Sequence, residues 1–74
     1  MKITIVFKNE KSEKEFIIGQ LKMYEDDFIE TDNIVEINGV TKIHGNQYHI
    51  ILVSKGKNIY IKSDSILEYY IKER

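Results

Sequence analysis

Residues 34–43, Ile34-Val35-Glu36-Ile37-Asn38-Gly39-Val40-Thr41-Lys42-Ile43, carry the strongest local structural signal in this sequence. Two short runs rich in β-branched residues flank an Asn-Gly dipeptide. Such a dipeptide readily adopts the two positive φ angles that a tight two-residue hairpin turn needs. We therefore predict a hairpin in which strand 34–37 pairs with strand 40–43.

The sequence that follows has a similar pattern, in which short apolar runs are separated by turn residues. Gly45-Asn46 and Ser54-Lys55-Gly56-Lys57 are both typical turn sequences. The elements predicted around them are strands at 47–53 and 58–62, a helical turn at 63–65, and a last strand with Leu67, Tyr69 and Ile71 in alternation. A C-terminal helix is the alternative for the last of these.

The N-terminal residues 2–8 also alternate, with Ile3, Ile5 and Phe7 on one face. This pattern predicts a strand, and the polar residues 9–13 predict a turn after it.

Residues 14–24 fit two structures. Phe16 and Ile18 alternate as in a strand that continues a hairpin from the first one. The helical alternative depends on apolar residues at helical spacing behind a capping-box pair: Ile17, Leu21, Tyr24 and Phe28, preceded by Ser12 and Glu15. Gly19 in mid-segment disfavours a helix by about 1 kcal/mol. We therefore predict a strand at 14–19, followed by an irregular acidic stretch.

Composition supports a single β-rich domain over residues 1–74. The chain has fourteen Ile and four Val but no Ala, and β-branched residues suit a pleated sheet. The predicted fold is mainly β, with α+β as the alternative: a small SH3-like or Sm-like, partly open barrel of five or six strands with one helical turn. A chain this short has a thin core and no cysteine to staple it, so we also expect a homodimer.

The sequence lacks the groups that catalysis needs. It has no cysteine, its serines lie in turns, and its glycines stand singly rather than in a phosphate-binding loop. His44 and His49 flank one turn, but two histidines fall short of the three or four ligands of a zinc site. We predict a protein that is not an enzyme and holds neither cofactor nor metal. With no signal peptide or membrane span, we expect it in the cytosol.

Charge is distributed unevenly along the chain. Residues 20–36 carry Lys22 alone against six acidic residues, whereas the flanking segments are mildly basic. Five of these acidic residues form a candidate patch: Glu25, Asp26, Asp27, Glu30 and Asp32. A solvated loop is one interpretation, and a patch that meets a basic surface is the other.

Gln20-Leu21-Lys22-Met23-Tyr24 has the order glutamine, leucine, any residue, aliphatic, aromatic. It resembles the short peptide by which bacterial polymerases and repair proteins attach to the β sliding clamp, with Met and Tyr in place of the commoner Leu and Phe. The resemblance implies that Gln20 is a polar anchor and that Leu21, Met23 and Tyr24 fill apolar subsites.

Together with the acidic residues that follow it, the motif resembles the small clamp inhibitors of Twort-type staphylococcal phages, which are dimeric as a class. The resemblance implies a phage protein of the host cytosol that occupies the peptide pocket of the clamp. It would block polymerase recruitment and DNA loading, and so shut down host replication. Its acidic segment would then act as a partial DNA mimic towards the basic clamp channel.

The alternative function is an Sm-like or SH3-like module that binds nucleic acid. Lys55, Lys57 and Lys62 lie near Tyr60 in sequence, which is a weak form of the basic, aromatic stripe of such modules. The overall acidity of the chain makes nucleic acid the less favoured partner.

Overall fold

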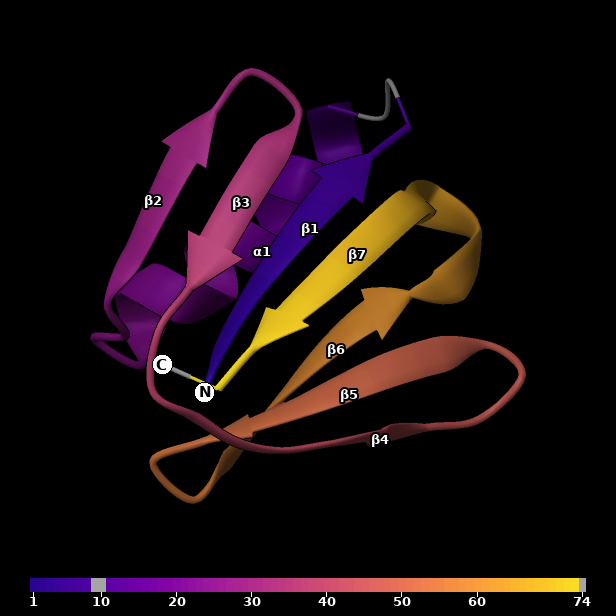
Figure 1. The fold of residues 1–74 in the computed structure, drawn as a ribbon. Helices are drawn as coiled ribbons and strands as arrows, with labels where there is room; N and C mark the ends of the chain where they lie inside the picture. Colours follow the sequence, from indigo (N-terminus) through magenta and orange to yellow (C-terminus); the bar gives the residue numbers. More distant parts are fainter. Residues whose placement is uncertain (9–10, 74) are drawn as a thin grey trace.

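A computed structural model describes residues 1–8 and 11–73, and within these ranges it contains seven strands, one α-helix and one 3₁₀ turn (Figure 1). In chain order the elements are β1 (Lys2–Phe7), α1 (Lys11–Met23), β2 (Phe28–Thr31), β3 (Ile34–Ile37), β4 (Val40–Gly45), β5 (His49–Ser54), β6 (Lys57–Lys62), η1 (Ser63–Ser65) and β7 (Ile66–Lys72). The prediction of a mainly β fold is confirmed, with seven strands rather than five or six and a full helix in addition to the helical turn.

The strands form two antiparallel sheets, one in the order β2-β3-β1-β7 and one in the order β4-β5-β6. Figure 1 shows α1 lying across one face of the four-stranded sheet, with the three-stranded sheet at an angle beside it. The sheets do not close into a continuous barrel, which agrees with the predicted partly open form. They meet where Met1 and Val40 exchange two backbone hydrogen bonds, of 2.8 and 3.0 Å.

The strand predicted at 14–19 is wrong, because these residues belong to α1. The turn predicted at 9–13 is also wrong where residues 11–13 begin the helix, and residues 9 and 10 lie outside the described ranges. Ile17 and Leu21 are fully buried on one helix face. Burying such a side chain stabilises the fold by about 1.5–3 kcal/mol, which exceeds the cost of an exposed Gly19 in the helix.

The hairpin predicted across Asn38-Gly39 is also wrong. β3 pairs with β1 and β2, whereas β4 pairs with β5 in the other sheet. Of the two residues of this dipeptide, only Gly39 has a positive φ, of 75°, although a tight Asn-Gly hairpin turn needs two. Ile37 and Val40 are both buried, each against its own sheet, so core packing carries the chain from one sheet to the other here.

The two later hairpins are confirmed. β4 and β5 are joined by a turn in which Asn46 Oδ1 accepts hydrogen bonds from the backbone of Tyr48 and His49 at 2.8 and 2.9 Å. β5 and β6 are joined at Lys55 and Gly56, whose φ angles of 53° and 74° are those of a type I′ turn. The predicted helical turn at 63–65 and the last strand are present as η1 and β7.

The core is formed by both sheets and the helix. Its buried apolar side chains are Ile3, Ile5, Phe7, Ile17, Ile18, Leu21, Val35, Ile37, Val40, Leu52, Ile59 and Ile61. Since α1 packs against residues of both sheets, it holds the two layers together. The position of each residue on α1 therefore decides whether its side chain is buried in the core or free to act at the surface.

Gly19→Ala should stabilise the protein by about 1 kcal/mol, because Gly19 is helical, is exposed and has no heavy atom within 4 Å of a Cβ built on it. Urea unfolding followed by circular dichroism measures this change. Gly56→Ala is the control and should destabilise, since Gly56 has a φ of 74°. A loss of stability in Gly19→Ala would contradict the helix.

Candidate functional site at the end of the helix

The last turn of α1 ends in a Schellman motif. The Asp26 amide donates to the carbonyl of Leu21 at 2.9 Å, and the Glu25 amide donates to that of Lys22 at 3.2 Å. Glu25 has a φ of 56°, in the left-handed region where glycine is usual. This bend directs consecutive side chains of the acidic segment to different sides of the molecule.

Gln20 and Leu21 are both engaged in contacts within the fold. The Gln20 amide nitrogen donates to the carbonyl of Tyr60 at 3.3 Å, and its oxygen accepts from the Tyr60 amide at 3.4 Å. Leu21 is fully buried in the core. The first two residues of the Gln20–Tyr24 motif thus join α1 to β6 and to the core.

Met23 and Tyr24 lie at the surface. Met23 is 76% exposed, the largest exposure among the apolar side chains of the described residues. Tyr24 is half-buried against the core, and Lys57 Nζ lies 5.1 Å from the centre of its ring, within the range of a cation–π contact. The motif is therefore not extended here, and only its second half faces solvent.

The five acidic residues do not form one patch. Asp26 is buried, and its Oδ1 accepts a hydrogen bond from Ser54 Oγ at 2.8 Å, so its inclusion in a surface patch is wrong. Its Oδ2 has no hydrogen-bond partner among the described residues. The Schellman bend causes this burial by turning Asp26 towards β5, while Glu25 and Asp27 stay exposed.

Glu30 and Asp32 belong to a different part of the surface. Glu30 is on β2 and pairs with Lys14 at 3.2 Å, and Asp32 occupies the β2–β3 turn with a φ of 50°. The backbone carbonyl of Asp32 also accepts a hydrogen bond from Lys14. The structure thus separates these two from the exposed acidic residues at the helix end.

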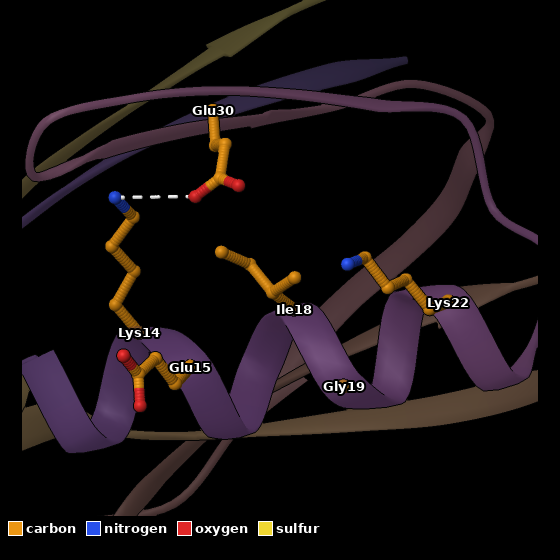
Figure 2. A pocket seen from close by; sticks show the side chains of 6 residues that line it. All are labelled: Lys14, Glu15, Ile18, Gly19, Lys22 and Glu30. Atoms are coloured by element: carbon orange, nitrogen blue, oxygen red, sulfur yellow. Dashed lines mark ion pairs between the residues drawn. The ribbon is translucent and has the colours of Figure 1, made fainter.

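A shallow hollow of about 380 Å³ lies between α1 and β2. Figure 2 shows Lys14, Ile18 and Lys22 extending from the helix towards Glu30. The residues that line it are Lys14, Glu15, Ile18, Gly19, Lys22 and Glu30. Sequence reasoning missed this hollow because it treated 14–19 as a strand. The signal was present in the spacing of Lys14, Ile18 and Lys22, which shares one helix face.

The lysines proposed for nucleic-acid binding do not converge. Lys55 donates to the carbonyl of Glu25 at 2.9 Å, and Lys57 lies over Tyr24. Lys57 and Lys62 stand at opposite ends of β6, about 16 Å apart at a strand rise of 3.3 Å per residue. They also fall on opposite faces of the strand, because side chains alternate along it.

His44 and His49 both lie at the β4–β5 end of the smaller sheet. The ring of His49 contacts that of Tyr60 edge-on, with centroids 6.1 Å apart. Across residues 1–8 and 11–73, no three side chains of the metal-binding types gather into a group.

Comparisons with protein-family models, with curated protein sequences and with solved structures found no significant match. None of the helices in the described ranges has the length and apolar character needed to cross a membrane. The interpretation of the helix end therefore depends on its own residues. We define the helix-end surface as Met23, Tyr24, Glu25 and Asp27, two apolar and two acidic side chains.

Leu21→Ala should lower the free energy of unfolding by about 2–5 kcal/mol, because Leu21 is fully buried. Met23→Ala should change it by no more than about 0.5 kcal/mol, because Met23 is mostly exposed. Denaturant unfolding of both variants measures the difference. Equal, small effects would mean that Leu21 is not in the core and that the motif is presented differently.

Proposed function

We propose that this chain is a binding protein without a catalytic step, and that its partner is a bacterial replicative sliding clamp. By occupying the clamp it would block polymerase recruitment and DNA loading and so stop host DNA replication. In this proposal the protein is encoded by a phage and acts in the cytosol of the host cell.

The observation that carries the proposal is the composition of the helix-end surface. Met23 and Tyr24 offer apolar area next to the exposed carboxylates of Glu25 and Asp27. A sliding clamp offers the matching pair of features, an apolar peptide pocket and a channel lined with basic groups. Apolar anchors supply most of the energy of such a contact, whereas charges mainly select the partner and speed association.

The position of the motif in the folded protein limits the ways in which it can bind the clamp. Binding as an extended peptide would withdraw Leu21 from the core and break both hydrogen bonds between Gln20 and Tyr60. The loss of a buried leucine alone costs about 2–5 kcal/mol. We therefore propose that the folded surface binds, with Met23 and Tyr24 as its apolar anchors and Gln20 and Leu21 supporting them from below.

The exposed carboxylates of Glu25 and Asp27 are the acidic part of the helix-end surface. Glu25 and Asp27 would lie towards the basic groups of the clamp, as a partial mimic of DNA phosphates. Binding to nucleic acid has less support, because Lys55 and Lys57 are engaged with Glu25 and Tyr24 rather than free to form a basic stripe.

Calorimetric titration into purified bacterial sliding clamp should give binding that a polymerase tail peptide displaces. Met23→Ala should weaken this binding about tenfold or more, because it removes an exposed apolar anchor. Phe16→Ala is the matched control, since Phe16 is 60% exposed on the same helix but lies outside the helix-end surface. No heat of binding at micromolar concentrations would refute the proposal.

Glu25→Gln combined with Asp27→Asn should weaken clamp binding at low salt and much less at high salt, because exposed charges are screened. The control is Asp64→Asn combined with Glu73→Gln, which removes the same charge from exposed positions elsewhere. Titrations at two salt concentrations measure the effect. A loss that does not depend on salt, or an equal loss in the control, would contradict a specific acidic contact.

A further inference from the structure

The three-stranded sheet is the basic part of a chain that is slightly acidic as a whole. Residues 37–63 contain four lysines and two histidines but no aspartate or glutamate, although the whole chain has a net charge of −1. This stretch forms all of the sheet β4-β5-β6 (Figure 1). Asp26 reaches the sheet from the core side, at the buried Ser54. Positive charge is therefore concentrated on one of the two sheets.

One face and one edge of this sheet are occupied by the rest of the protein. Its inner face packs into the core, where Leu52 is fully buried. At the outer edge of β6, the amide of Tyr60 donates to Gln20 Oε1 at 3.4 Å. The amide of Lys62 donates to Glu13 Oε1 at 3.3 Å. Side chains of α1 therefore cover this edge against pairing with a further strand, and a partner of the sheet would bind its outer face.

The strand register gathers lysines and rings on the outer face. His44 and Tyr60 both lie opposite Ile51, each on a strand beside β5. Side chains at opposite positions of antiparallel strands point to the same side, and so do alternate side chains along each strand. The outer face therefore holds five basic or ring side chains, which we call the basic sheet face: Lys42, His44, His49, Tyr60 and Lys62.

The two lysines of the basic sheet face lie at opposite corners, with rings between them. The register places Lys42 and Lys62 two strands and four residues apart, roughly 16 Å between their Cα atoms. Both lysines and His44 are exposed. Tyr60 is 44% exposed, and its ring contacts that of His49 edge-on with centroids 6.1 Å apart. Basic groups interspersed with accessible rings are suited to holding a nucleic-acid strand.

We propose that the basic sheet face binds single-stranded nucleic acid. Lys42 and Lys62 contact phosphates at two points along the strand, and the ring of Tyr60 stacks on a base between them. A span of roughly 16 Å corresponds to about five nucleotides stacked at 3.4 Å each, within the range of about 4–16 that a small β domain engages. This activity is separate from clamp binding, because the basic sheet face shares no residue with the helix-end surface.

The rings select a single strand over other anionic partners. An acidic protein surface offers carboxylates to the lysines, but it has no row of planar bases to stack on Tyr60. A duplex offers phosphates, but its bases are stacked on one another and only their edges reach the grooves. A flat sheet face also lacks the helix or ribbon that enters a groove. A single strand supplies both phosphates and free base faces.

The basic sheet face differs from the stripe of Lys55, Lys57 and Lys62 expected from the sequence. Lys55 and Lys57 are engaged with Glu25 and Tyr24, and only Lys62 belongs to both sets. The overall acidity of the chain disfavoured nucleic acid, but all of its acidic residues lie outside 37–63. The fold thus separates a basic face from the acidic segments of the same chain.

Fluorescence anisotropy with a labelled oligothymidylate of about 15 nucleotides should show micromolar binding at low salt. Lys42→Gln combined with Lys62→Gln should weaken it about tenfold and lower the slope of log K against log salt by about 1.4, because each phosphate contact on a single strand contributes about 0.7. The matched control is Lys8→Gln combined with Lys72→Gln, which removes the same charge from exposed lysines outside the three-stranded sheet. No binding by the wild type, or an equal loss in the control, would overturn the proposal.

Variants of Tyr60 test stacking separately from charge. Tyr60→Leu should weaken binding about fivefold or more, whereas Tyr60→Phe should keep it, because only the second retains a ring. Circular dichroism should show both variants folded, since this side chain points away from the core. Wild-type affinity in Tyr60→Leu would refute stacking on this face.

Competition identifies the class of partner. Unlabelled oligothymidylate should displace the labelled strand at a concentration about tenfold lower than either its duplex with oligoadenylate or polyglutamate, because neither competitor offers free base faces. Equal displacement by polyglutamate would mean that the face binds acidic protein instead. Equal displacement by the duplex would mean that phosphates alone are recognised, and either result would overturn the proposal.

Discussion

The packing of α1 against both sheets is the contact on which the rest of this structure depends. Ile17 and Leu21 enter a core to which one sheet contributes Ile3 and Ile5 and the other contributes Ile59. Gln20 and Glu13 add hydrogen bonds to the backbone of β6. Backbone pairing between the sheets is limited to a few residues such as Met1 and Val40, so burial under the helix holds the open barrel together.

The parts of the fold that the sequence predicts well are those decided locally. The β5–β6 hairpin depends on Lys55 and Gly56, whose positive φ angles form the turn by themselves. The β4–β5 turn depends on Asn46, whose side chain bonds to the backbone two and three residues later. Such interactions are visible in a few consecutive residues, and both predictions were confirmed.

Two of the wrong predictions concern segments whose structure is decided by distant partners. Gly19 disfavours a helix locally, but the burial of Ile17 and Leu21 against strands far along the chain outweighs it. Asn38-Gly39 favours a hairpin locally, yet Ile37 and Val40 are each required by a different sheet. In both cases tertiary burial outweighed the local preference, which for Gly19 in a helix is about 1 kcal/mol.

In the candidate site, too, some features follow from the local sequence and others depend on the tertiary structure. A linear motif identifies residue types at a spacing, but it carries no information about which side chains point inward. The helical phase of α1 places Leu21 in the core and Met23 in solvent, and the Schellman bend separates Asp26 from Asp27. Sequence alone therefore located the candidate surface to within a few residues but could not tell which of its side chains are exposed.

The covered edge of β6 has a consequence for how the chain reaches its native state. Its amides are satisfied by side chains of a helix that precedes β6 by some forty residues, so this protection exists only once the helix has docked. Before docking, the edge of β6 is open, so an incompletely folded chain exposes a strand edge that the native protein covers. Changes that loosen α1 therefore promote aggregation as well as unfolding, and the helix serves as an intramolecular guard against it.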